Sequence, residues 1–121
     1  MIVETLQTFD HVRKSFSSAT SRAARSEIGQ FLTPADIAQF MSSLFESAPQ
    51  QVKILDPGAG AGVLFAMCVE TLISQENHPL SIEVVAYETD DAILPHLEET
   101  MKRGQSLCTA AGIAFQGIVR T

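Results

Sequence analysis

The sequence contains no tryptophan and only two cysteines, and its apolar residues are divided among short segments. None of these segments approaches the roughly 20 apolar residues of a membrane-spanning helix. Glu4 and Asp10 interrupt the N-terminal stretch, so we expect neither a signal peptide nor a membrane segment. Cys68 and Cys108 lack metal-ligand spacing. We expect them to be buried free thiols of a cytoplasmic protein that holds no metal.

Basic residues are also scarce. Eight lysines and arginines stand against fourteen aspartates and glutamates, which gives a formal net charge of −6. Residues 1–30 hold four bases and three acids, whereas residues 31–121 hold four bases and eleven acids. Because binding a nucleic-acid backbone requires clustered lysine and arginine, the acidic segment at residues 31–121 is not expected to bind DNA by itself.

Residues 1–30 are expected to form an amphipathic helical segment ahead of a domain at residues 31–121. Apolar side chains recur at spacings of three and four from residue 3 to about residue 26, which aligns them on one helix face. We interpret the opposite, basic face as solvated; an edge near DNA or a partner domain is the alternative. The apolar positions are Leu6, Phe9, Val12, Phe16, Ala19 and Ala23, and the basic ones are Arg13, Lys14, Arg22 and Arg25.

A second helix is expected after Gly29. Thr33 suits its N-cap and Pro34 its first helical position, while Asp36 stands where the acid of a capping box belongs. The free N–H groups of such a helix start can also bind a carboxylate. The helix should end near Ser47 and carry one apolar face, made of Ile37, Phe40, Met41, Leu44 and Phe45.

Short apolar strands then alternate with helical patterns. The expected strands are residues 52–55, 82–87 and 113–119, and the expected helices are residues 63–75 and about 91–111. This alternation predicts an α/β fold with a parallel sheet. Asp91 is the expected cap of the last helix, which Gly104 should bend or end, and Gly117 is expected to mark a bulge.

Three glycines alternate with alanine directly after the first strand, in the sequence Asp56-Pro57-Gly58-Ala59-Gly60-Ala61-Gly62. The dinucleotide fingerprint G-x-G-x-x-G fails, because its third glycine would fall on Val63, and the lysine of a P-loop is missing. A strand that runs into such a turn and then a helix brings bare backbone close to a ligand. A tight turn without a ligand is the less favoured interpretation.

Acidic residues end the first two strands. Asp56 and Glu88 should lie in one crevice, because ligands of parallel α/β sheets bind outside the carboxyl ends of the strands. Glu88 follows Gly62 by 26 residues, which suits an acid that accepts hydrogen bonds from ribose hydroxyls. A solvated loop acid is the alternative.

Three segments together resemble the N-terminal, cofactor-binding part of DNA adenine-N6 methyltransferases from bacterial restriction-modification systems, of the gamma motif order. They are Gln30-Phe31-Leu32-Thr33-Pro34, Leu55-Asp56-Pro57-Gly58-Ala59-Gly60-Ala61-Gly62 and Tyr87-Glu88-Thr89-Asp90. The resemblance covers about residues 28–120. It implies a Rossmann-like, S-adenosylmethionine-dependent methyltransferase fold, with a partial parallel sheet of three strands and two N-terminal helices.

The resemblance also implies roles for individual residues. Thr33 and the backbone near Pro34, in the element that begins with Phe31, would hold the methionine carboxylate of S-adenosylmethionine. Asp56 would orient the loop and the cofactor's amino group, and Glu88 would take the ribose hydroxyls. The implied cofactor-binding residues are Phe31, Thr33, Pro34, Asp56, Pro57, Gly58, Ala59, Gly60, Glu88 and Thr89, the last of which would lie against the adenine ring.

The family's catalytic motif, Asn/Asp-Pro-Pro-Tyr/Phe, does not occur in this sequence. We therefore expect a cofactor-binding fragment that is inactive alone and contacts DNA only through other parts of its parent enzyme. The family's fourth strand, which lies beside the first, is likewise not found, so self-association through the free edge of the first strand is expected.

Two other functions share the glycine loop. A small-molecule or protein methyltransferase would lack the Phe-Leu-Thr-Pro element, and a non-catalytic interaction domain would keep the fold without using the cofactor. A dehydrogenase fragment is disfavoured by Val63.

Overall fold

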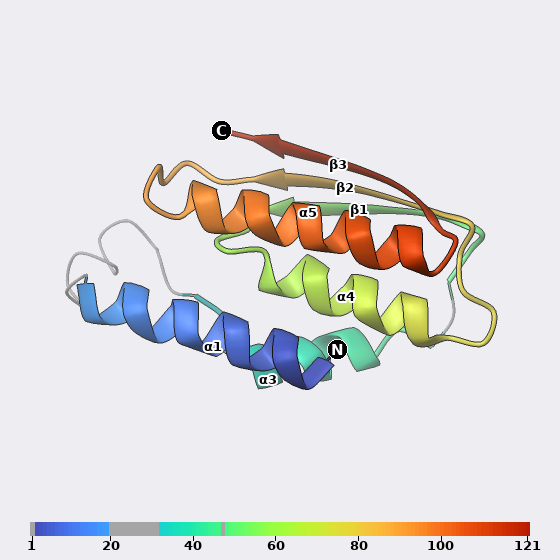
Figure 1. Ribbon diagram of the computed structural model, residues 1–121, viewed down its shortest axis with the longest axis horizontal. Helices are drawn as coiled ribbons and strands as arrows, with labels where there is room; N and C mark the ends of the chain where they lie inside the picture. Colours follow the sequence, from blue (N-terminus) through green and yellow to red (C-terminus); the bar gives the residue numbers. More distant parts are fainter. Residues whose placement is uncertain (1, 20–31, 47) are drawn as a thin grey trace.

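The computed structural model describes residues 2–19, 32–46 and 48–121 (Figure 1). Its helices are α1 (Ile2–Ala19), α3 (Ala35–Ser43), α4 (Val63–Ser74) and α5 (Leu94–Ala110), and its strands are β1 (Gln51–Pro57), β2 (Ser81–Tyr87) and β3 (Ala114–Arg120). The predicted α/β class with two N-terminal helices is confirmed. The predicted continuation of the first helix to residue 26 lies outside the described residues.

The three strands form one parallel sheet in the order β1-β2-β3. Pairing runs in register from Gln51 opposite Ser81 to Tyr87 opposite both Pro57 and Arg120. Because all strands point the same way, their carboxyl ends meet at one edge of the sheet. The predicted three-stranded parallel sheet is confirmed, and this edge is where such sheets bind ligands.

The helices form two layers on one side of the sheet. Helices α4 and α5 cover the sheet, and α1 and α3 lie beyond α4 (Figure 1). The buried side chains between sheet and helices include Phe65, Val69, Ile82, Val84 and Leu97. On the opposite face of the sheet Leu55 is 67% exposed, since no described element covers it.

The apolar face of α3 points outward. Ala35, Ala38 and Ser42 are buried instead, because small side chains let α3 approach α4 closely. The predicted apolar residues are all between 45% and 65% exposed; they are Ile37, Phe40, Met41, Leu44 and Phe45. The helix also ends at Ser43, four residues before the predicted end.

The predicted start of α3 is wrong in detail. Pro34 occupies the N-cap position, and no side chain caps the helix from there. Asp36 accepts a hydrogen bond from the N–H of Ile37, next to it in sequence, at 2.9 Å. The N–H of Ala35 instead donates a hydrogen bond to Asp10 Oδ1, on α1, at 3.3 Å. A contact between distant segments thus replaces the local cap that the sequence suggests.

The predicted cap of α5 is also wrong. The helix begins at Leu94 rather than after Asp91, because residues 90–93 form a separate turn. Asp90 Oδ1 accepts a hydrogen bond from the N–H of Ala92 at 2.8 Å within that turn. Pro95 lies in the first turn of the helix, as predicted.

Gly104 and Gly117 allow α5 to pack closely on β3. Helix α5 continues through Gly104, where a Cβ would lie 3.5 Å from Phe115 Cζ. Gly117 pairs in register with Val84 without a bulge, and a Cβ there would collide with the Met101 side chain. The predicted helix break and bulge are therefore wrong, since both glycines make room between layers.

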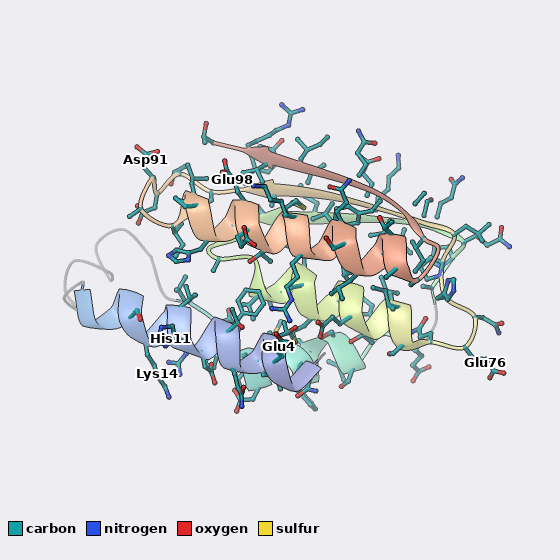
Figure 2. The ribbon with its side chains drawn as sticks, in the orientation of Figure 1. Glu4, His11, Lys14, Glu76, Asp91 and Glu98 are labelled. Carbon is teal, nitrogen blue, oxygen red and sulfur yellow. The ribbon has the colours of Figure 1, made fainter. Side chains whose placement is uncertain are left out.

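A buried polar cluster fixes α1 against α4 and α5. Thr5 Oγ1 donates a hydrogen bond to Glu70 Oε1 at 2.5 Å, and Arg103 Nη2 donates to Thr5 Oγ1 at 2.8 Å. Arg103 also lies 3.9 Å from Glu4 Oε2. Lys14, on the outer side of α1, points away from the sheet (Figure 2).

Both cysteines are free. Cys108 is fully buried, and burial raises the pKa of its thiol to about 11. Cys68 is half-buried, and burial raises its pKa as well. No helix in the described ranges is long and apolar enough to cross a membrane.

Candidate functional site

The glycine loop after β1 lies at the carboxyl edge of the sheet. Gly58, Gly60 and Gly62 have φ angles of 70°, 59° and 89°, which L side chains rarely adopt. A Cβ added at Gly58 would meet nothing within 4 Å, so the backbone there faces open space. The N–H of Ala59 donates to the carbonyl of Tyr87 at 2.8 Å and ties the loop to β2. The loop can therefore offer bare backbone to a ligand.

The carboxylate of Glu88 holds the loop directly. Its Oε1 accepts a hydrogen bond from the N–H of Gly60 at 2.9 Å. Its Oε2 accepts from the N–H groups of Thr89 and Asp90, at 2.8 and 2.9 Å. Because a carboxylate has about four acceptor sites, these three bonds leave room for about one more. Glu88 can thus orient the loop and still accept a ligand hydroxyl.

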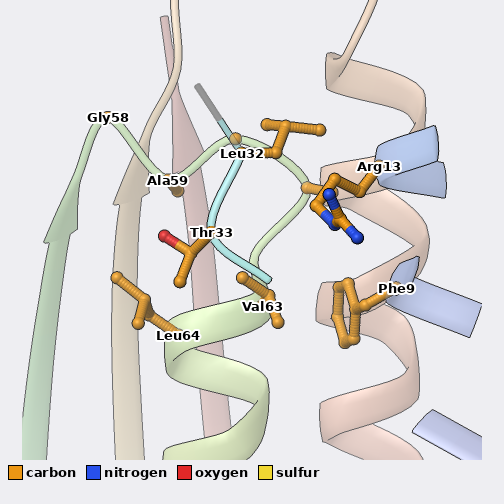
Figure 3. Close-up of a pocket in the computed structure, with 10 residues that line it drawn as sticks. Phe9, Arg13, Leu32, Thr33, Gly58, Ala59, Val63 and Leu64 are labelled. Carbon is orange, nitrogen blue, oxygen red and sulfur yellow. The ribbon is translucent and has the colours of Figure 1, made fainter. Parts of the chain in front are cut away.

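A cavity of about 40 Å³ lies beside the glycine loop (Figure 3). A buried water occupies about 10–15 Å³ by the same measure, so the cavity has room for a carboxylate rather than a whole nucleotide. Thr33 lies between Ala59 and Leu64 in this view. We call this space the loop cavity; its lining residues are Phe9, Arg13, Leu32, Thr33, Gly58, Ala59, Gly60, Ala61, Val63 and Leu64.

Asp56 faces a different hollow. A wider apolar groove of about 360 Å³ lies between α3 and the edge of β1. We call it the α3–β1 groove; its lining residues are Ala38, Met41, Ser42, Leu44, Phe45, Ile54, Leu55, Asp56, Leu64, Phe65 and Cys68. Leu64 lines both hollows, so Asp56 lies next to the loop cavity without lining it.

Asp56 is buried, and only 7% of the residue is exposed. Burial raises its pKa, and a hydrogen bond from the N–H of Phe65 acts in the opposite direction. Its Oδ2 is buried and has no hydrogen-bond partner among the described residues. A buried acceptor without a partner is destabilising, which fits a position that a cationic ligand group completes.

The structure brings most of the predicted site residues together. Thr33, Gly58, Ala59 and Gly60 line the loop cavity, and Glu88 is bonded to that loop. Pro34 is half-buried at the N-cap of α3, while Pro57 and Thr89 are exposed at the ends of β1 and β2. Phe31 lies outside the described residues.

Helix α1 contributes to the candidate site in a way that the sequence did not predict. Arg13 was expected on a solvated face, but it lines the loop cavity together with Phe9. The signal was available in the spacing, because residues four apart share a helix face and Phe9 is buried. In the sequence this signal is masked by the basic residues that share the predicted solvated face.

A parallel sheet with a glycine loop at its carboxyl edge, and an acid after the next strand, defines a Rossmann-like domain for nucleotide-type cofactors. A family profile described as N-6 DNA Methylase matches residues 7–95, from α1 to the start of α5. The chain belongs to this family. The match includes the loop cavity and Glu88, so the resemblance seen in the three sequence segments is confirmed.

Two curated relatives are type II methyltransferases. The chain is 30% identical over 107 residues to the type II methyltransferase M.PstI of Providencia stuartii, covering 88% of this chain and 20% of that protein. It is 34% identical over 101 residues to the type II methyltransferase M.BsuBI of Bacillus subtilis, covering 83% of this chain and 19% of that protein. The chain thus spans about a fifth of the length of these relatives.

Proposed function

We propose that this chain binds the methyl donor of a site-specific DNA methyltransferase that modifies the exocyclic amine of adenine in a restriction-modification system. The observation that carries the proposal is the glycine loop with its cavity, in a chain of the N-6 DNA Methylase family. Family membership argues against a small-molecule or protein methyltransferase. A non-catalytic domain of the same fold is the alternative that binding experiments exclude.

In this proposal each part of S-adenosylmethionine has its own partner. Thr33 and the backbone at Pro34 hold the carboxylate, and the glycine loop packs against the cofactor through its exposed backbone. Glu88 accepts a ribose hydroxyl with its remaining acceptor site, and Thr89 lies against the adenine. Asp56 gives its unpartnered Oδ2 to the cofactor's amino group, which supplies the positive charge that this buried carboxylate lacks.

When bound, S-adenosylmethionine supplies an electrophilic methyl group. The chain's own residues bind and orient the donor, and we assign none of them to the transfer, because the family's catalytic motif does not occur in this sequence. DNA would be held by other parts of the parent enzyme. The two free cysteines fit a cytoplasmic protein.

Calorimetric titration tests the proposal. S-Adenosylmethionine should bind with one-to-one stoichiometry, and NAD should not compete, because the loop lacks the third glycine of the dinucleotide fingerprint. The absence of heat in a sample with a cooperative thermal unfolding transition would instead support the non-catalytic alternative.

Substitution of Glu88 tests the assigned orientation. Glu88→Ala should cost about 1.5–3 kcal/mol of donor binding, because it removes a charged acceptor for both the loop and the ribose. Glu83→Ala is the matched control, since Glu83 lies near the amino end of β2, the strand that Glu88 follows. Unchanged affinity in the Glu88 variant would refute the ribose role.

A further inference from the structure

We propose, building on the methyl-donor function above, that Arg13 of α1 binds the amino-acid carboxylate of the donor in the loop cavity. Asp10, also on α1, pairs with the Arg13 guanidinium in the free protein. The donor's carboxylate displaces Asp10 when it binds. Helix α1 is thereby part of the binding site and not only a packing element.

Arg13 brings a positive charge into a mostly apolar space. Its side chain is 31% exposed and lines the loop cavity beside Leu32 and Phe9 (Figure 3). The Nε atom is buried, and it makes no hydrogen bond within the described part of the chain. A guanidinium donor that is buried and unsatisfied gains most from an anionic acceptor.

The carboxylate of Asp10 already provides an anionic acceptor close to Arg13. Its Oδ1 lies 3.5 Å from Arg13 Nε and 3.3 Å from the N–H of Ala35, at the start of α3. Both distances exceed the roughly 2.7–2.9 Å of a good charge-assisted hydrogen bond. Because Asp10 and Arg13 are three residues apart on one helix, the carboxylate cannot align well with both donors. A free carboxylate does not have this restriction.

The cavity also selects the end of the donor that enters. Its volume of about 40 Å³ suits a carboxylate, and Thr33 adds a hydroxyl to the same wall. Glu88 would repel a carboxylate, and it is bonded to the loop without lining the cavity, so its acceptor oxygens suit ribose. Charge and size together direct the amino-acid end toward Arg13.

Two nucleosides that differ only in the amino-acid part test this inference. S-Adenosylhomocysteine carries the carboxylate, and 5′-methylthioadenosine lacks the whole amino-acid group. Arg13→Gln should weaken S-adenosylhomocysteine binding about 10-fold and leave 5′-methylthioadenosine within about 2-fold. Lys14→Gln is the matched control, because it removes the same charge from the outward side of α1 (Figure 2).

Asp10→Asn removes the internal competitor. It should strengthen S-adenosylhomocysteine binding about 3-fold, and this gain should vanish in the Arg13→Gln/Asp10→Asn double variant. Equal losses for both nucleosides in Arg13→Gln, or weaker binding in Asp10→Asn, would overturn the inference. If neither nucleoside binds the wild-type chain, the methyl-donor function itself fails. If both bind and Arg13→Gln changes neither, only the role of Arg13 fails.

Discussion

Asp56 carries a charge that the folded chain solvates poorly. Burial raises its pKa, and its Oδ2 has no hydrogen-bond partner among the residues described. A raised folded-state pKa means that the folded chain binds the proton more tightly than the unfolded chain. The free energy of unfolding therefore increases as the pH falls through the folded-state pKa, and it levels off below the unfolded-state pKa. At pH values above the folded-state pKa, the buried carboxylate is charged, and the full cost of burying that charge lowers the free energy of unfolding.

Asp56→Asn should separate stability from binding. At pH 7 the variant should gain about 0.5–2 kcal/mol in free energy of unfolding, because the buried charge is gone. It should also bind S-adenosylmethionine more weakly, because the cofactor's amino group loses its carboxylate. Urea unfolding at pH 7 and pH 5 measures the first effect, with the exposed Asp36→Asn as control. An Asp56→Asn variant less stable than wild type at pH 7 would contradict this account.

Among the helices and strands, periodicity and glycine spacing predicted the elements that local sequence determines. The predicted 63–75 helix and 82–87 strand match α4 and β2 closely, and the loop between Asp56 and Gly62 was placed correctly. Features set by contacts between distant segments were not predicted. Asp10 replaces a local cap at Ala35, and the small face of α3, rather than its apolar face, meets α4.

In the candidate site, too, the features that local sequence determines were predictable, and those that depend on contacts between distant segments were not. Thr33, the glycine loop and Glu88 were predictable, because motif spacing and the carboxyl edge of a parallel sheet place them near one another. Arg13 was not, since its entry into the cavity depends on how α1 docks on α4 and α5. That docking rests on the buried contacts of Thr5 with Glu70 and Arg103, which are 65 and 98 residues away in sequence.

Thr5→Val tests how α1 is attached. The substitution keeps the shape but removes the hydroxyl, which leaves the buried Glu70 carboxylate without this donor. The free energy of unfolding should fall by about 1–3 kcal/mol. Thr8→Val is the matched control on the same helix, because the Thr8 hydroxyl bonds an exposed carbonyl. Equal stability of Thr5→Val and wild type in urea unfolding would show that the cluster does not hold α1.

For the whole molecule, the α3–β1 groove is an apolar surface that the described elements leave uncovered. Strand β1 has an unpaired edge there, and the groove contains no charged residue except the buried Asp56. We propose that a second copy covers it, because two identical edges can pair about a two-fold axis while their apolar grooves meet. The net charge of −6 opposes this pairing, so salt should strengthen it.

Sedimentation velocity at increasing concentration and salt measures this association. The wild-type chain should form dimers, and Leu55→Glu should shift the equilibrium to monomer by placing a charge at the edge of β1. Leu80→Glu is the matched control, because Leu80 is similarly exposed, at 60%, but lies away from the groove. A wild-type chain that stays monomeric throughout would reject the proposal.

The proposed function depends on donor binding by the glycine loop and its cavity. Amide NMR during titration with S-adenosylmethionine locates the bound donor, since each residue reports its own change. Shifts should concentrate at Arg13 and at residues 32–34, 56–62 and 88–90, and they should saturate together. Shifts confined to β3 or to residues 41–45 of α3 and the turn after it, or no shifts from a folded chain, would contradict donor binding at the loop.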